Sequence, residues 1–344
     1  MKYLLLVVVL LLSGCQPKTQ ADFIEGFSEE LSNQLRESES LYNKVKNECT
    51  YKSTVKQMME ADLFDENKVD ILCDIELKQG KEMALSSLMK SDLSSDTVKG
   101  FIELPFYRSA NTERYLDTRT RFPEFTNVDV VVYVNIGVDR PYFTDVQRID
   151  DLDDKAMLVN KYSALPGGYE PPELIVTPSP CAIGYHYSCS TNDPQYVEKT
   201  AGEHFLQLVE AANEEGIKIN SIASYRTYEY QRNLYNYNLN LNGQEYTDLY
   251  YARPGQSEHN SGLAIDVTMN DLNYNEIHLD SIYPWLIDNM AEYGFILRYP
   301  EDKTHLTGFG YESWHLRYVG KDIAKTIMEN NWCLEEYYAR KESD

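Results

Sequence analysis

The sequence predicts an α+β protein with a mainly antiparallel sheet flanked by helices, preceded by a mostly helical N-terminal region. Two observations support this fold class. Over the C-terminal half, short β-branched and apolar segments alternate with segments of helical periodicity, and their connections suit antiparallel pairing. The chain has 344 residues, of which 42% are hydrophobic, so it is also long enough to bury at least one large core.

The N-terminal region has the apolar spacing of helices. Apolar residues recur every four positions in the first half of residues 21–47, which predicts one amphipathic helix. Residues 111–121 also have a helical pattern. Residues 128–136, VDVVVYVNI, are β-branched and apolar, which predicts a buried strand. Proline and glycine gather over residues 166–180, so we expect a domain boundary or a linker there.

Beyond residue 195, helices and strands alternate regularly. Helices are predicted at 200–215, 227–238, 282–293 and 322–330, and strands at 217–224, 263–269, 295–298 and 314–319. The predicted domain limits are a signal peptide at 1–14, an N-terminal helical region at 15–105, an intermediate segment and linker at 106–180, a C-terminal domain at 181–335 and a tail at 336–344.

The charge of the chain restricts its partners. Lys and Arg number 32 against 55 Asp and Glu, which gives a net charge of -23. Most of such a surface repels a phosphate backbone, so we expect no nucleic-acid partner.

The N-terminus predicts the compartment. Residues 4–12 form an apolar run of about 14 Å as a helix, too short to span a bilayer but typical of a signal peptide. The residues before Cys15, Leu-Ser-Gly, resemble a bacterial lipobox, in which the cysteine is lipidated after cleavage. We therefore expect an extracytoplasmic lipoprotein, anchored to a bacterial membrane through Cys15. The alternative is an ordinary secretory signal with a chance cysteine.

Five further cysteines would then lie in an extracytoplasmic setting. Cys181 and Cys189 are close enough to bridge a short loop, and Cys49 could pair with Cys73. Cys333 would remain unpaired. None has the CxxC spacing of a structural zinc site.

Two segments contain candidate metal ligands. In residues 257–266, SEHNSGLAID, His259 and Asp266 are seven positions apart and cannot share one face of a continuous strand, so a bend is needed, which Gly262 can supply. In residues 311–318, YESWHLRY, strand alternation points His315 away from the tryptophan that precedes it. Two histidines and one carboxylate with an open fourth position form the ligand set of a catalytic zinc.

The same segments supply groups that such a site uses. Glu312 lies at the entrance of the predicted strand, and a nearby glutamate that is not a ligand is the base that a catalytic zinc requires. Residues 224–231, SYRTYEYQ, form a strand-to-helix turn that presents Arg226 and Gln231. A guanidinium there can hold a carboxylate or a developing oxyanion. Arg317 is expected to form a structural salt bridge.

These motifs resemble one peptidase family. SEHNSGLAID is similar to the SxHxxGxAxD motif, and ESWH to the ExWH motif, of the VanY-type D-alanyl-D-alanine carboxypeptidases. Their zinc peptidase superfamily also holds D,D-dipeptidases and the hedgehog signalling domain. The likeness covers residues 195–330, and residues 133–144 resemble the segment that often precedes this domain. Ser313 stands where the family more often has proline, a difference that removes no chemical group.

The resemblance implies a hedgehog/D,D-peptidase-like domain, with zinc as the cofactor. It assigns the metal to His259, Asp266 and His315. Glu312 would be the general base and acid, and Arg226 would polarise the scissile carbonyl or steady the oxyanion.

Three further residues are implied to contact the substrate. Gln231 and Ser257 would meet the terminal D-alanine or its carboxylate, and Trp314 would form part of the pocket wall. The implied function is hydrolysis of the terminal D-Ala-D-Ala bond of peptidoglycan stem peptides. A D,D-endopeptidase, a D,D-dipeptidase and an L,D-carboxypeptidase share this chemistry and stay open. A non-catalytic cell-wall-binding lipoprotein is the competing class, which the intact base and ligand set argue against.

Overall fold

The computed structural model describes residues 29–47, 49–50, 52–61, 63–64, 68–77, 82–140, 145–177, 194–270 and 272–341. The chain forms two compact units, Met1–Asp117 and Thr118–Asp344, whereas the sequence suggested limits near residues 105 and 180. The predicted signal peptide, Cys15 and the Cys181 and Cys189 pair lie outside the described residues. Within the described ranges, no helix has both the length and the apolar character needed to cross a membrane.

The first unit is helical, as predicted. Its helices are α2 (Glu29–Glu37), α3 (Glu39–Asn47), α4 (Lys52–Glu60), α5 (Val69–Asp74), α6 (Glu82–Lys90), α7 (Ser95–Ile102), the 3-10 turn η2 (Ser109–Asn111) and the start of α8 (Thr112–Arg121). The prediction of a single helix over 21–47 is wrong in its described part, which forms the two helices α2 and α3. The hydroxyl of Ser38 accepts a hydrogen bond from the backbone N–H of Leu41, which caps α3 and separates it from α2. Cys49 and Cys73 form a disulfide, as predicted.

The second unit is built on a four-stranded antiparallel sheet. Its strands, in spatial order, are β5 (Ile219–Ala223), β6 (Ala264–Met269), β8 (Glu312–Tyr318) and β7 (Phe295–Tyr299). All four strands coincide with predicted segments to within two residues. Two small sheets accompany it, an antiparallel pair of β3 (Leu174–Thr177) and β4 (Gln195–Glu198) and a parallel pair of β1 (Gln147–Arg148) and β2 (Ser163–Ala164).

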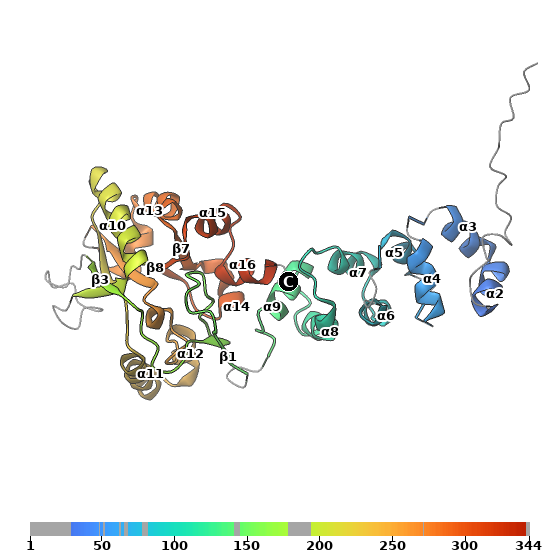
Figure 1. Cartoon of the computed structure of the whole chain (residues 1–344), viewed down its shortest axis with the longest axis horizontal. Coiled ribbons are helices and arrows are strands. Elements are labelled where there is room, and N and C mark those ends of the chain that lie inside the picture. The colour runs from blue at the N-terminus through green and yellow to red at the C-terminus, as the bar shows by residue number, and fades with distance from the viewer. Residues whose placement is uncertain are drawn as a thin grey trace, which may run out of the picture. The chain divides into compact units, whose positions relative to one another are not determined.

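Helices and 3-10 turns complete the second unit (Figure 1). They are α9 (Asn127–Asn135), α10 (Lys199–Glu214), α11 (Tyr228–Asn242), α12 (Gln244–Tyr250), η4 (Glu258–Ser261), η5 (Tyr274–Leu279), α13 (Tyr283–Asn289), η6 (Met290–Tyr293), η7 (Glu301–Lys303), α14 (Thr304–Thr307), α15 (Lys321–Glu329) and α16 (Leu334–Arg340). The helix predicted at 282–293 is thus α13 continued by a 3-10 turn, and the helices predicted at 200–215, 227–238 and 322–330 are confirmed.

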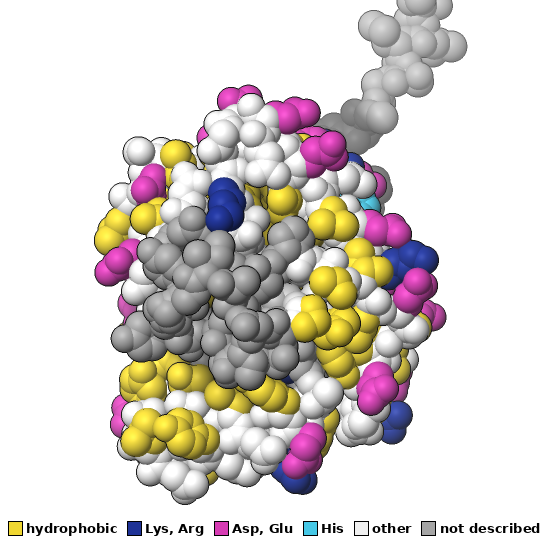
Figure 2. All heavy atoms as spheres, turned by 90° about the vertical axis from the view of Figure 1, so that its left-hand side faces the viewer, with side chains coloured by type: hydrophobic (Ala, Val, Ile, Leu, Met, Phe, Trp, Pro, Cys, Tyr) yellow, Lys and Arg dark blue, Asp and Glu magenta, His cyan; other side chains and the backbone are white. Residues whose placement is uncertain are grey.

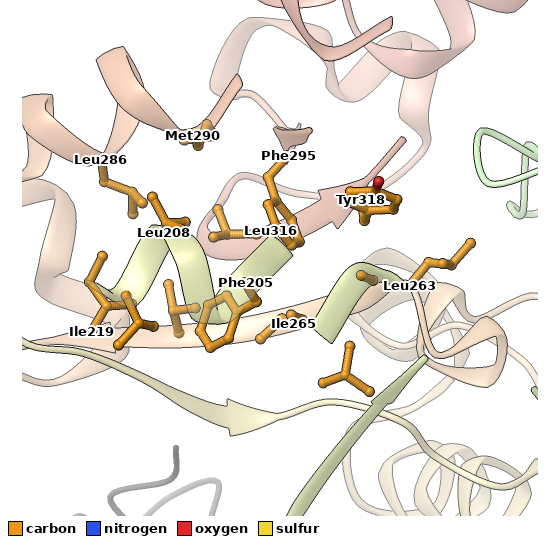
Figure 3. Packing of buried hydrophobic residues seen from close by; sticks show 14 of the residues in the cluster. Phe205, Leu208, Ile219, Leu263, Ile265, Leu286, Met290, Phe295, Leu316 and Tyr318 are labelled. Atoms are coloured by element: carbon orange, nitrogen blue, oxygen red, sulfur yellow. The ribbon is translucent and has the colours of Figure 1, made fainter. Parts of the chain in front are cut away.

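The main hydrophobic core lies between α10 and one face of the sheet. Phe205 of α10 packs over Ile265 of β6 and Leu316 of β8, as Figure 3 shows. Strand side chains alternate between faces, so the neighbours of these core residues, Asp266 and His315, point to the opposite face. The sheet therefore separates an apolar core from a polar face.

Residues 128–136 are not the strand that the sequence predicts. They form the helix α9, which begins at a capping box in which Thr126 and Asp129 each bond the backbone of the other. The helix packs against α16, and its valines are buried: Val130, Val131, Val132 and Val134. Burial on more than one side explains why the segment is apolar without helical periodicity.

Gly262 supplies the predicted bend, and we expect Gly262→Ala to destabilise the second unit. Gly262 has a left-handed φ of 73°, which costs other residues about 1–2 kcal/mol. A Cβ at this position would also lie 3.2 Å from the backbone nitrogen of Glu198 and 2.9 Å from Cγ of Pro171. Gly216→Ala is the matched control, because Gly216 has a φ of 75° and open space around its Cβ. Urea denaturation should show the larger loss for Gly262→Ala. Equal losses would mean that the contacts relax without cost.

Candidate active site

The register of the sheet brings two predicted ligands face to face. Asp266 of β6 is the direct cross-strand partner of His315 of β8. Side chains of such partners are close neighbours on one face of a sheet. Oδ1 of Asp266 lies 3.1 Å from Nδ1 of His315. Strand pairing alone therefore aligns these two groups.

The third predicted ligand, His259, arrives from the turn η4. Its Nδ1 donates a hydrogen bond to the backbone oxygen of Ser224, at 2.7 Å, which leaves Nε2 to face the other two residues. Nε2 lies 3.3 Å from Oδ2 of Asp266. The bend at Gly262 thus brings the two ends of the SEHNSGLAID motif together, as the sequence predicted.

These three residues fit a metal ion. His259, Asp266 and His315 are buried, and one ligand atom from each lies within 4.8 Å of the others. Oδ1 of Asp266 has no hydrogen-bond partner among the described residues, so it is available to a cation. Two imidazoles, one carboxylate and a free fourth position suit zinc.

The electrostatics of the site also favour a cation. Burial, with the Arg226 guanidinium nearby, lowers the pKa of His259 to about 4, so its ring is neutral at pH 7, as a metal ligand must be. Burial alone would lower the pKa of His315, but Asp266, Glu258 and Glu312 raise it well above its ordinary value. Asp266 and Glu312, which both lie beside Nδ1 of His315, therefore favour a positive charge where the ligand atoms converge.

Glu312, the predicted base, lies beside the metal ligands. It is the first residue of β8, and its Oε2 is 3.2 Å from Nδ1 of His315. Burial raises the pKa of its carboxyl above the ordinary value. A carboxylate with a raised pKa, next to the metal position and open to the cavity, is suited to take and return a proton.

Arg226 lies at the turn between β5 and α11, and its backbone is fixed to η4. Its N–H donates to the oxygen of His259 at 3.0 Å, and its own oxygen accepts from Nδ2 of Asn260 at 2.7 Å. The guanidinium is partly exposed, with Nη2 3.4 Å from Oδ2 of Asp266. Arg226 thus presents a cation at the edge of the candidate metal site.

A cavity of about 1060 Å³ opens over these residues. Its lining includes every residue that the sequence predicted for the metal, the chemistry and the substrate: Arg226, Gln231, Ser257, His259, Asp266, Glu312, Trp314 and His315. Tyrosines supply much of the remaining wall: Tyr196, Tyr225, Tyr230, Tyr246, Tyr250, Tyr251, Tyr274 and Tyr299. Figure 2 shows groups of hydrophobic side chains on the visible surface at this end of the second unit.

The three predicted substrate contacts differ in how they are held. Gln231 is buried, and its Nε2 donates to the backbone oxygen of Ala252 at 2.7 Å, while its Oε1 has no partner among the described residues. Ser257 is buried immediately before η4. Trp314 packs edge-on against Tyr274, with ring centroids 4.9 Å apart, and lines the cavity wall as predicted.

A buried charge cluster, which the sequence did not predict, lies behind the site. Oε1 of Glu258 accepts hydrogen bonds from Nε of Arg298 at 2.7 Å and from Nη1 of Arg317 at 2.6 Å, and these side chains have no solvent exposure. Glu335 binds the other side of Arg298 through two hydrogen bonds. The predicted salt-bridge role of Arg317 is confirmed. Arg298 could have been noticed as a charge within the apolar strand FILRY, since such a residue needs a buried partner.

Catalytic sites of zinc hydrolases combine such an open set of ligands with a neighbouring base, and here this arrangement occupies the floor of a cavity. A family model described as D-alanyl-D-alanine carboxypeptidase, VanY, matches residues 194–321, which contain all the residues of the site. The chain belongs to the VanY family of D-alanyl-D-alanine carboxypeptidases. Its peptidase site brings together three residues, His259, Asp266 and His315, that can hold a metal ion.

Individual relatives extend over more of the chain. The bifunctional D-Ala-D-Ala dipeptidase and D-Ala-D-Ala carboxypeptidase VanXYC of Enterococcus gallinarum is 37% identical over 187 residues, which are 53% of this chain and 92% of the relative. YodJ of Bacillus subtilis is 34% identical over 213 residues, 59% of this chain and 76% of the relative. Among solved structures, that of the LdcB LD-carboxypeptidase is described as revealing the molecular basis of peptidoglycan recognition. The two sequences are 34% identical, the match covers 57% of this chain and 91% of that chain, and the TM-score is 0.52.

Proposed function

We propose that this peptidase is a zinc-dependent D,D-carboxypeptidase that removes the C-terminal D-alanine from peptidoglycan stem peptides. The observation that carries the proposal is the convergence of His259, Asp266 and His315 on one point, with Glu312 3.2 Å from the His315 ring, on the floor of a large cavity. Relatives that act on D-Ala-D-Ala support this choice of substrate.

In this proposal the three ligands would hold zinc, which supplies Lewis acidity and makes water a nucleophile near pH 7. Glu312 accepts the proton of the attacking water and then delivers it to the departing amine. Arg226 donates hydrogen bonds to the carbonyl oxygen as negative charge develops on it. The buried position of the ligands excludes bulk water, which strengthens each of these interactions.

The substrate's free carboxylate needs a partner for an exopeptidase to recognise it. Arg226 and Ser257 both line the cavity and can donate hydrogen bonds to a carboxylate. Gln231, whose Nε2 already bonds Ala252, has its Oε1 free to accept from a peptide N–H. We propose that these groups together orient the terminal D-alanine.

An L,D-carboxypeptidase is the second candidate. It is favoured by the similarity to the LdcB LD-carboxypeptidase, of which this chain covers 91%. Both activities release one D-alanine by the same zinc chemistry, and they differ in the residue that precedes the scissile bond.

Mass spectrometry of the products tests this proposal. The protein without residues 1–15 is incubated with a stem pentapeptide ending in D-Ala-D-Ala and, separately, with the tetrapeptide ending in a single D-alanine. Loss of one alanine from the pentapeptide, abolished by a chelator, is the expected result. Loss of an intact dipeptide would indicate a D,D-dipeptidase, and cleavage of the tetrapeptide alone an L,D-carboxypeptidase. Inactivity on both, and on crosslinked peptides that an endopeptidase would cut, would favour a binding protein.

We also propose that the enzyme is a lipoprotein outside the cytoplasm, tethered through Cys15 beside its polymeric substrate. Two acyl chains on one cysteine give stable attachment to a membrane. Cys15→Ala should therefore move the protein from the membrane fraction to the soluble fraction of the cell. Membrane association that survives this change would exclude Cys15 as the anchor. The matched control is Cys333→Ala, because Cys333 is a buried free cysteine in the second unit.

A further inference from the structure

The two nitrogens of His315 face different environments. Nδ1 lies 3.1 Å from Oδ1 of Asp266, on the side where the candidate ligand atoms converge. Nε2 lies on the far side of the ring, 3.5 Å from Oε2 of Glu258. Neither Nε2 nor this Oε2 has a hydrogen-bond partner among the described residues, and both residues are buried.

Glu258 is held rigidly at its other oxygen. Oε1 accepts from Arg298 at 2.7 Å and from Arg317 at 2.6 Å. Arg317 is itself fixed by hydrogen bonds to the backbone oxygens of Lys155 and Met157. Because both arginines bond Oε1, Oε2 remains the acceptor that faces the His315 ring.

This arrangement decides which nitrogen of His315 carries the proton. A neutral imidazole has one N–H and one lone pair, and a metal ligand must offer the lone pair. If Nδ1 binds the metal, the proton belongs on Nε2, where it needs an acceptor. The carboxylate of Glu258 is the group in that place.

We infer that Glu258 is a positioning residue, which holds the His315 ring through Nε2–H so that Nδ1 is presented to zinc. The inference rests on the proposed zinc site. His259 has the opposite arrangement, because its Nδ1–H donates to Ser224 and its Nε2 faces the site. The two histidines therefore bind as opposite tautomers, each oriented by a partner outside the metal site, an arrangement that generally strengthens metal binding.

Glu258→Gln tests this inference. Arg298 and Arg317 offer only donors, so the amide oxygen of the new glutamine turns to them and its NH2 faces Nε2 of His315. A donor at that position favours the tautomer with the proton on Nδ1, which opposes metal binding. Zinc affinity, measured by competition with a chromogenic chelator, should fall about 10- to 100-fold.

Glu335→Gln is the matched control. Glu335 is equally buried and bonds the same Arg298, at 2.7 and 2.8 Å, but within the described part of the chain it forms no hydrogen bond or ion pair with His315. It should keep the zinc affinity of the unmodified protein even if the charge cluster loses stability. Unchanged affinity in a folded Glu258→Gln protein, or an equal loss in Glu335→Gln, would overturn the inference. If the unmodified protein failed to bind zinc, that result would overturn both the proposed function and the inference about Glu258.

A measurement on the unmodified protein removes any dependence on how the variants fold. Long-range ¹H–¹⁵N correlation spectra of the zinc-loaded protein report which nitrogen of each histidine is protonated. Among the signals that change when zinc is removed, we expect one histidine with its proton on Nδ1 and one with its proton on Nε2. Two zinc-sensitive histidines that are both protonated on Nδ1 would contradict the role of Glu258.

Discussion

Glu312→Gln should abolish turnover while the protein keeps its zinc. The amide has nearly the same shape as the carboxylate but cannot accept the proton of the attacking water, and general acid–base catalysis contributes about 10²- to 10⁴-fold to a rate. Glu312 lies next to the three ligands without being needed to complete the His–Asp–His set. We therefore expect kcat to fall by that factor, with zinc content unchanged in metal analysis of the same preparation.

The control for this substitution is Glu276→Gln. Glu276 is an exposed glutamate of η5 that does not line the cavity, so its loss should leave both turnover and zinc content unchanged. Turnover by Glu312→Gln at the rate of the unmodified enzyme would exclude Glu312 as the base. Loss of zinc from Glu312→Gln would instead assign Glu312 to the ligands.

His259→Ala should lose zinc and activity together. Removal of the imidazole leaves one histidine and one carboxylate, too few to hold a catalytic zinc, and it also removes the hydrogen bond to Ser224. The loss of turnover should be at least as large as that of Glu312→Gln, about 10²- to 10⁴-fold or more, because the base is useless without the metal. Metal analysis after dialysis and the rate of stem-peptide hydrolysis would measure both effects.

His204→Ala provides the comparison for His259→Ala. His204 lies on α10, whose apolar face covers the opposite side of the sheet, and its ring packs beside Tyr318. This change should leave zinc binding and activity intact, with at most a small loss of stability. Full zinc occupancy in a folded His259→Ala protein would remove His259 from the ligand set.

Some errors in the predicted fold could have been avoided from local sequence alone. The segment 128–136 is rich in valine, so its composition favoured a strand. The helix-start signal was nevertheless present, because Thr126 and Asp129 have the spacing of a capping box. Burial of most of α9 removed the helical periodicity that would have identified it. Ser38 is a similar case, since serine is a common helix N-cap.

The chemical groups of the site, and the local bend that joins two of them, could be predicted from the sequence. Motif spacing identified His259, Asp266, His315 and Glu312, and the need for a bend identified Gly262. These features are local, because strand alternation and the conformational freedom of glycine depend on a few adjacent residues.

The orientation of these groups depends on contacts between distant parts of the chain. The pairing of Asp266 with His315 depends on the register of β6 with β8, which are separated by more than forty residues of chain. Glu258 meets Arg298 and Arg317 from 40 and 59 positions away. Such contacts arise from long-range packing, and a buried charge is stable only when the fold supplies its partner, so no local pattern could reveal that Glu258 faces His315.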